Sequence, residues 1–153
     1  MFEVLDQCGV SWELLIISSD RNPGVLTDYC GEARQNGIKV FIAGAGMAAR
    51  LPGSVAANTK YFSPVIGVAL PSEEHPDALD ALLSIVRSPA GCPVTCSGIG
   101  KAGLRNAAIR AVQILGAGDD EKSKKIAEKL TAYLYQNRKD PQIGYKKSQR
   151  KED

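Results

Sequence analysis

The sequence predicts an α/β fold, with a doubly wound parallel sheet between two layers of helices. Two observations lead to this prediction. Short apolar runs alternate with amphipathic stretches along the chain, and most of the runs are continuously apolar. Continuous apolar strands are typical of parallel sheets buried on both faces, and right-handed crossovers then favour double winding. The 153 residues contain no internal repeat or low-complexity segment and suit one domain.

Four apolar runs predict the strands of this sheet. Each is short and is followed by a loop with polar residues, glycine or proline, as expected for a buried strand. The runs are WELLIIS (12–18), IKVFIAG (38–44), SPVIGVAL (63–70) and CPVTCSG (92–98).

The stretches between these runs predict the helices. Pro23 suits the first turn of a helix and Gly37 suits the position just past its end, which together predict a helix over 23–36. The remaining predictions are helices at SVAANT (54–59), 77–86 and 104–116, and a turn at IGKAG (99–103).

A final helix is predicted over 119–139, because charges gather on one face and Ile126, Leu130, Tyr133 and Leu134 on the other. We expect the basic segment after it to be a solvated end, with a weak phosphate-attracting arm as the alternative. The chain therefore divides into an α/β domain (1–118), the helix (119–139) and a basic tail (140–153).

Composition excludes several classes of protein. The hydrophobic share of 44% and the charged share of 24% are ordinary for a globular protein, and a net charge of +2 predicts no nucleic-acid or membrane partner. No apolar run is long enough to span a bilayer, and the start lacks the pattern of a signal peptide. We therefore expect a cytoplasmic protein.

The cysteines do not predict a metal site. They stand at positions 8, 30, 92 and 96, without a CxxC spacing, and the chain has a single histidine. Zinc sites usually combine several such ligands at close spacings. We expect reduced, half-buried thiols and no metal.

Three loops follow the carboxyl ends of predicted strands. They are SSDRNP (18–23), AGAGMAARLPG (43–53) and SGIGKAG (97–103). In a doubly wound fold such loops converge on one crevice, where ligands bind.

The residue types in these loops each allow a functional and a structural interpretation. Gly44 and Gly46 can let backbone N–H groups approach an anion, or can simply form a tight turn. Arg21 is a candidate phosphate clamp or a surface arginine, and Asp20 a candidate acid or base or an ordinary residue at a helix start. We expect His75, in another loop, to be exposed and idle.

These loops together resemble one family, the class I N5-carboxyaminoimidazole ribonucleotide mutases, also called aminoimidazole ribonucleotide carboxylases. The family loop Ser-Ala-His-Arg-Thr-Pro corresponds to SSDRNP, and Gly-Ala-Gly-Gly-Ala-Ala-His-Leu-Pro-Gly corresponds to GAGMAARLPG. The strand PVIGV and the helix and turn LDALLSIVRSP also match family motifs. The resemblance extends from about residue 3 to residue 116.

The resemblance implies an enzyme of purine biosynthesis with a flavodoxin-like sheet. Members move a carboxylate from the exocyclic nitrogen of a ribonucleotide to a ring carbon, or add CO₂ there directly, without a metal or organic cofactor. They form homo-octamers in which the last helix reaches neighbouring subunits. On this basis residues 119–139 would need a partner chain to cover their apolar stripe.

The resemblance also implies roles for individual residues. Ser18 and Arg21 would hold the substrate, with Arg21 at its phosphate. The pocket for the carboxylate and the base would be lined by Gly44, Ala45, Gly46 and Leu51. Asp20 stands where the family has its proton-transfer histidine, and Arg50 stands where the second loop has a histidine.

The departures from the family pattern favour an alternative function. Aspartate titrates near pH 3.9 and histidine near pH 6.5, so Asp20 would have no proton to give at neutral pH. Arg50 adds a charge, and Met47 adds bulk at a family glycine. The family's opening strand and phosphate-binding loop have no match, which would leave the central strand position empty. A relative that binds a nucleotide or serves in assembly without turnover is therefore the second hypothesis.

Overall fold

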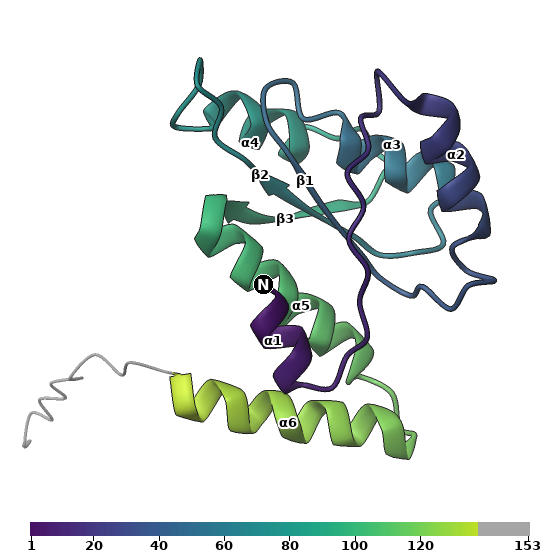
Figure 1. Cartoon of the computed structure of the whole chain (residues 1–153), viewed down its shortest axis with the longest axis vertical. Coiled ribbons are helices and arrows are strands. Elements are labelled where there is room, and N and C mark those ends of the chain that lie inside the picture. Colours follow the sequence, from purple (N-terminus) through teal and green to yellow (C-terminus); the bar gives the residue numbers. More distant parts are fainter. Residues whose placement is uncertain (138–153) are drawn as a thin grey trace, which may run out of the picture.

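The computed structural model describes residues 1–137. A parallel sheet of three strands lies at its centre, in the order β1 (Phe41–Ala45), β2 (Val65–Ala69), β3 (Val94–Ile99) (Figure 1). Val65 of β2 lies opposite Phe41 and Val94 in the register. The predicted tail (140–153) lies outside the described residues. The fold is α/β and of the flavodoxin-like type predicted from the sequence.

Alternating residues of the strands point to the two helical layers. On one face, Phe41 and Ala43 pack against α2 (Pro23–Glu32) and α3 (Leu51–Asn58). Farther along the same face, Ala69 and Ile85 pack together, and Ile85 belongs to α4 (Leu79–Val86).

The opposite face of the sheet carries α5 (Gly100–Leu115). Ile66 and Val68 of β2 pack there against Ala107 and Ala111. All five residues of β2 are buried, because it has a strand on each side and a helical layer on each face.

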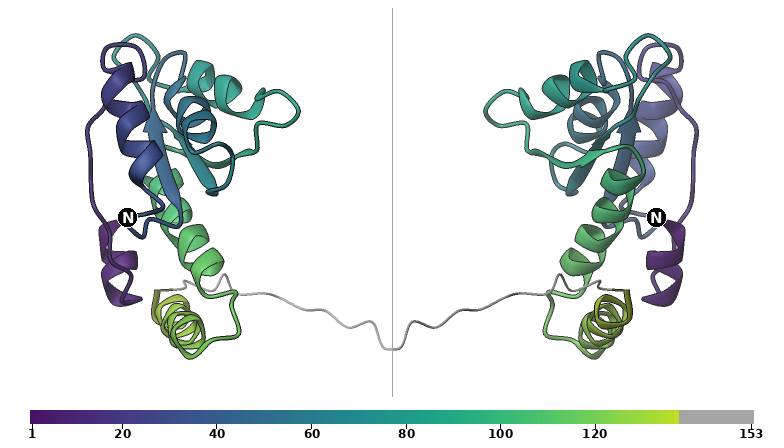
Figure 2. Two further views of the ribbon diagram at one scale, coloured as in Figure 1. Left: turned by 90° about the vertical axis from the view of Figure 1, so that its right-hand side faces the viewer. Right: turned by 90° about the vertical axis from the view of Figure 1, so that its left-hand side faces the viewer.

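Two further helices lie beside α5, the short α1 (Phe2–Gln7) and the longer α6 (Glu121–Asn137). Both pack against α5, and α6 crosses beside α1 (Figure 2). Ile126, Leu130 and Tyr133 are buried there, while Leu134 is 36% exposed. The expectation that the apolar stripe of this helix needs a partner chain is therefore wrong for three of its four residues, which α1 and α5 cover.

The predicted strand at 12–18 is wrong. These residues form an extended thread that joins α1 to α2 without entering the sheet (Figure 1). The physical reason is that a strand needs a neighbour for its backbone N–H and C=O groups, and among residues 1–137 the edge strand β1 pairs only with β2. An apolar run alone does not supply that neighbour.

The other differences concern element ends. Helix α3 begins at Leu51 because Pro52 fits the first turn of a helix, and α5 begins at Gly100, so the turn predicted at 99–103 is wrong. Gly98 has a φ of +113°, and a Cβ on Gly103 would lie 2.5 Å from the carbonyl carbon of Gly98. These two glycines let β3 pass directly into α5.

Candidate functional site

The loops at the carboxyl ends of the strands lie against one another. After β1, a Cβ on Gly46 would lie 2.9 Å from the carbonyl oxygen of Leu70, which follows β2. After β3, a Cβ on Gly100 would lie 3.8 Å from Cδ of Pro71. The loop around Leu70 and Pro71 therefore lies between the other two, and glycine permits the close approach at position 46.

The SSDRNP loop is organised by Ser18. Its Oγ accepts hydrogen bonds from the backbone N–H groups of Asp20 (3.4 Å) and Arg21 (3.2 Å), and its carbonyl accepts one from Asn22 (2.9 Å). Helix α2 then starts at Pro23. Ser18 thus shapes the turn that presents the side chains of Asp20 and Arg21.

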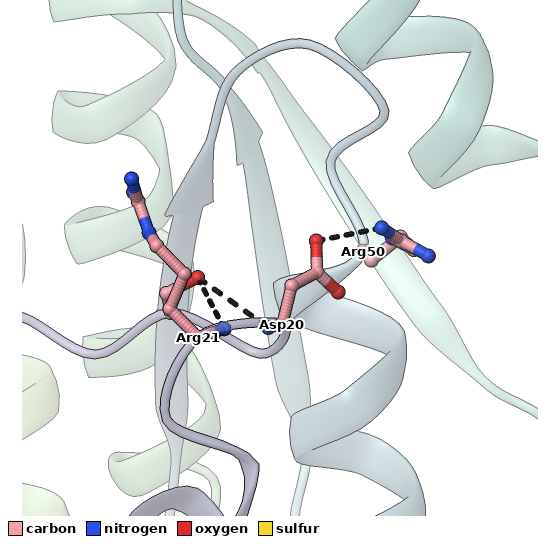
Figure 3. A network of polar contacts seen from close by, with 4 residues as sticks. Asp20, Arg21 and Arg50 are labelled. Atoms are coloured by element: carbon pink, nitrogen blue, oxygen red, sulfur yellow. Dashed lines mark hydrogen bonds and ion pairs between the residues drawn. The ribbon is translucent and has the colours of Figure 1, made fainter.

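Asp20 and Arg50 form an ion pair across two loops. Nη2 of Arg50 donates to Oδ2 of Asp20 at 2.7 Å, and the two side chains are 66% and 51% exposed respectively (Figure 3). Exposed pairs of this kind contribute little to folding stability, at most about 1 kcal/mol. The pair instead links the SSDRNP loop to the start of α3, where Arg50 is the residue before the first helical turn.

Arg21 points away from this pair. Figure 3 shows its guanidinium on the far side of the loop from Asp20 and Arg50. Its side chain is exposed. The two cations of the site therefore lie on different sides of the turn at Ser18, so that each can meet a different anionic group of one ligand.

The loop after β1 holds two non-glycine residues in the left-handed region. Met47 has a φ of 54° and Ala49 a φ of 38°, and the N–H of Ala49 bonds to the carbonyl of Gly46 at 3.0 Å. Such backbone conformations cost free energy and gather at functional loops. Met47 is 54% exposed, so its bulk is not packed into the loop.

The remaining predicted pocket residues also make packing contacts within the fold. Gly44 and Ala45 are the last residues of β1, and Ala45 packs against the cluster beside α4. Leu51 packs against the cluster between β1 and α2. A Cβ on Gly44 would meet the side chain of Leu70 at 3.0 Å. These residues position the loops, and their exposed partners Asp20, Arg21 and Arg50 carry the charge.

The loop after β2 is the part that sequence reasoning missed. His75 is 50% exposed, with Nε2 3.9 Å from Oδ2 of Asp80, and Oδ1 of Asp80 is buried without a hydrogen-bond partner among the described residues. PSEEHP (71–76) also follows a buried strand, so the rule that selected the other loops would have found it.

Other features lie away from this edge. Among residues 1–137, a cavity of about 390 Å³ lies between α1 and α6, lined by Cys8 and several lysines. Burial raises the pKa of the Cys8 thiol, while the charge of Lys129 opposes the shift. The same residues hold no group of three or more His, Cys, Asp or Glu placed to bind a metal, and none of their helices could cross a membrane.

Comparisons with known proteins identify relatives. The model of the AIR carboxylase family matches residues 1–139. The N5-carboxyaminoimidazole ribonucleotide mutase of Bacillus subtilis (strain 168) is 46% identical over 127 residues, which are 83% of this chain and 76% of the relative.

Two further relatives carry the same name. The Vibrio parahaemolyticus protein is 49% identical over 118 residues, covering 77% of this chain and 71% of its own length. The Saccharolobus solfataricus protein is 44% identical over 138 residues, covering 90% and 82% respectively.

Proposed function

Because the chain belongs to the AIR carboxylase family, we propose that it acts on a carboxylated aminoimidazole ribonucleotide in purine biosynthesis. The observation that carries the proposal is the match of the family model to residues 1–139, which include every loop of the candidate site. Relatives more than 40% identical are named N5-carboxyaminoimidazole ribonucleotide mutase.

The proposed reaction defines what the site must do. A mutase breaks the bond between the exocyclic nitrogen and the carboxylate carbon, and forms a bond from that carbon to a ring carbon. The nitrogen gains a proton and the ring carbon loses one, so the atoms balance without a cofactor. The site therefore has to hold two anions, a phosphate and a carboxylate, and to move protons.

The charged side chains fit these tasks. Arg21 would bind the phosphate and Arg50 the migrating carboxylate, because each is an exposed guanidinium on its own side of the SSDRNP turn. Ser18 would hold the turn, and Gly44, Ala45, Gly46 and Leu51 would shape the pocket. Asp20 would accept the proton leaving the ring carbon, since its carboxylate stands beside Arg50.

Proton donation is the weak step of this arrangement. Oδ2 of Asp20 accepts a hydrogen bond from Arg50, so in this contact it serves as an acceptor and offers no proton to the exocyclic nitrogen. A placed acid or base contributes on the order of 10²–10⁴ in rate. We therefore expect slower turnover than in a site with histidine at this position.

The same pair favours a second candidate function, nucleotide binding without turnover. The guanidinium of Arg50 is already paired with the carboxylate of Asp20, so the carboxylate of a ligand has to compete for it. In this case a ribonucleotide binds through Arg21 and the loop backbones, and no carboxylate moves.

One set of variants separates the two functions. We expect Asp20→His to raise the rate of interconversion of the carboxylated ribonucleotides at least tenfold, followed by ultraviolet absorbance, because histidine can donate and accept protons near neutral pH. Asp20→His combined with Arg50→His should be slower than the single variant, because it removes the guanidinium that would bind the migrating carboxylate. Asp28→His, at an exposed position in α2, is the matched control.

The outcomes are distinct. Binding of the ribonucleotide by calorimetry with no turnover in any variant would support the second function. Neither binding nor turnover would contradict both. Fast wild-type turnover that Asp20→His abolishes would contradict the weak step assigned to Asp20.

The proposal also includes a homo-octamer in the cytoplasm that needs no metal or organic cofactor and binds no nucleic acid. The support for these points is the family resemblance of the motifs. Light scattering coupled to size-exclusion chromatography tests the octamer, and activity after dialysis against a chelator tests the absence of a metal.

A further inference from the structure

The cavity between the C-terminal end of α1 and helix α6 is lined by lysines. Its volume of about 390 Å³ lies in the range of small-molecule pockets, roughly 300–1,000 Å³. Lys122, Lys125 and Lys129 all line it. They are spaced three and four positions apart, so they share one face of α6. In Figure 1 this helix lies at the bottom of the molecule, and the start of α2, next to the SSDRNP loop, lies at the top.

The three lysines have no anionic partner in the described part of the chain. No ion pair of Lys122, Lys125 or Lys129 is found among residues 1–137. Glu121 is the carboxylate in the lining, and its Oε1 lies 4.0 Å from Nζ of Lys124, which is outside the lining. The cavity therefore has an excess of positive charge. Like charges on successive turns of one helix repel each other, and a bound anion would relieve this repulsion.

Lys129 is placed at the wall of the cavity by Gly9. This glycine follows α1 with a φ of +69°, and a Cβ at this position would lie 2.6 Å from Nζ of Lys129. A side chain here would therefore displace the ammonium group. The charge of Lys129 also opposes the rise that burial causes in the pKa of Cys8. The ammonium group thus lies close to both the end of α1 and the buried thiol.

The backbone at the start of α6 is not available to an anion. The N–H groups of Lys122 and Ser123 donate to Oδ1 of Asp120 at 3.0 and 3.1 Å. A carboxylate of the chain itself therefore already caps this end of the helix. The lysine side chains are the groups that can meet a ligand.

We propose that this cavity binds a small phosphorylated molecule whose phosphate groups carry two or more negative charges. Each lysine acts as a point charge that can donate to a different phosphate oxygen. The buried side chains of Cys8 and Ile126 add an apolar part to the lining, which suits a compact organic group attached to the phosphate.

The distribution of charge favours a small molecule over a nucleic acid. Nucleic-acid sites are extended basic surfaces, usually on strongly basic domains. Here the lysines gather at one cavity, and the net charge of the whole chain is only +2. The cavity is also separate from Arg21, the residue proposed to bind the substrate phosphate, so this proposal does not depend on the proposed function.

The test uses inorganic pyrophosphate as the probe, because it is compact and carries several charges. The whole chain is acetylated with a limiting amount of an N-hydroxysuccinimide ester, with and without pyrophosphate, and mass spectrometry follows each lysine. We expect acetylation of Lys122, Lys125 and Lys129 to slow by about threefold or more, because an ammonium group bound to phosphate is less free to react. Lys124, on the same helix but outside the lining, should react at an unchanged rate.

Variants make the test specific to the cavity. Lys125→Gln removes the central cation and should weaken pyrophosphate binding by about tenfold in calorimetry, since hydrogen bonds to charged groups are among the strong ones. Lys124→Gln is the matched control and should keep the affinity. All of these lysines are exposed, so we expect unchanged melting temperatures.

Arg21→Gln separates this site from the candidate functional site. The variant removes the cation proposed to bind the substrate phosphate, and protection of the three lysines by pyrophosphate should persist in it. Absence of turnover in the wild type would contradict the proposed function and leave this result unaffected.

Four results would overturn the proposal. The first is no protection of the three lysines at millimolar pyrophosphate, and the second is equal protection of Lys124, which would mean general attraction of anions. The third is protection by a single-stranded oligonucleotide and not by pyrophosphate, which would make a nucleic acid the ligand. The fourth is protection without any probe that grows with protein concentration, which would mean that a second copy covers this face.

Discussion

Two apolar runs of similar composition adopt different structures in this molecule, one a buried strand and the other an exposed thread. Val65–Ala69 forms β2, with Ile66 only 1% exposed, whereas residues 12–17 form the N-terminal thread, with Ile16 96% exposed. β2 has a strand on each side and helices on each face, whereas the thread pairs with no strand in the described part of the chain. The difference shows that apolar content alone does not make a strand, because the backbone also needs partners.

The largest expected effect contrasts the two isoleucines directly. Ile66→Ala should lower the free energy of unfolding by about 2–5 kcal/mol, because it leaves a cavity between β2 and α5. Ile16→Ala should change it by less than about 0.5 kcal/mol, since the side chain contacts mostly solvent. Urea unfolding of both variants measures the contrast. A loss at Ile16 as large as at Ile66 would mean that the thread is buried in solution.

A smaller effect is expected at the anchor of the thread. Trp12→Ala removes the stack on Phe2 and the bond to Asp6, and should lower the free energy of unfolding by about 1 kcal/mol. Trp12→Phe keeps a ring and should lose about half as much. Equal losses in the two variants would show that the hydrogen bond, and not the stack, fixes this end of the thread.

At the start of α6, in contrast to the thread, backbone N–H groups have a side-chain partner, Asp120. Bonds from the Ser123 hydroxyl and from the N–H groups of Ser123 and Lys122 hold the pKa of Asp120 below its ordinary value. A lowered folded pKa adds stability that is present above about pH 4 and lost as the pH falls through the folded value.

Asp120→Asn should therefore lower the melting temperature at pH 7 and lower it less at pH 3. Thermal melts at the two pH values measure the difference, with Asp119→Asn as a control, since no hydrogen bond from its side chain is found among the described residues. A larger loss of melting temperature in Asp120→Asn at pH 3 than at pH 7 would contradict this explanation.

The smallest effect on stability concerns the exposed surface of the thread. Leu14→Lys together with Ile16→Lys should change the free energy of unfolding by less than about 0.5 kcal/mol, because both side chains are exposed. The same double variant should reduce light scattering at high protein concentration, since charges protect an unpaired edge from aggregation. Increased scattering would mean that the apolar residues are covered in the wild type.

The sequence predicted most of the sheet and the helices because periodicity and burial agree there. The runs at 38–44, 63–70 and 92–98 contain most of β1, all of β2 and most of β3, and the neighbours of these strands are also encoded by apolar runs. The prediction failed at 12–18, where the run is also apolar but pairs with no strand among residues 1–137. A pattern within one segment carries no information about the partner that the segment needs.

The sequence predicted which loops form the candidate site, but not the contacts between them. The rule that ligands bind at the carboxyl ends of strands located Arg50, which follows β1, but it reached Asp20, 30 positions away, through a predicted strand at 12–18 that is not formed. The loop that carries Arg50 has left-handed backbone angles at Met47 and Ala49, which such residues rarely adopt, so no local preference indicates its conformation. The position of the loop at 71–76 between the other two was not predicted, because this loop was taken as a simple connection.

Amide hydrogen exchange of the unbound chain, resolved at single residues, tests the comparison of the two runs most directly. The amide of Ile66 should exchange only through global unfolding, and those of Leu14, Leu15 and Ile16 should exchange at nearly the rate of an unstructured peptide. Similar protection of the two runs would contradict the account, because the thread would then have a backbone partner in solution.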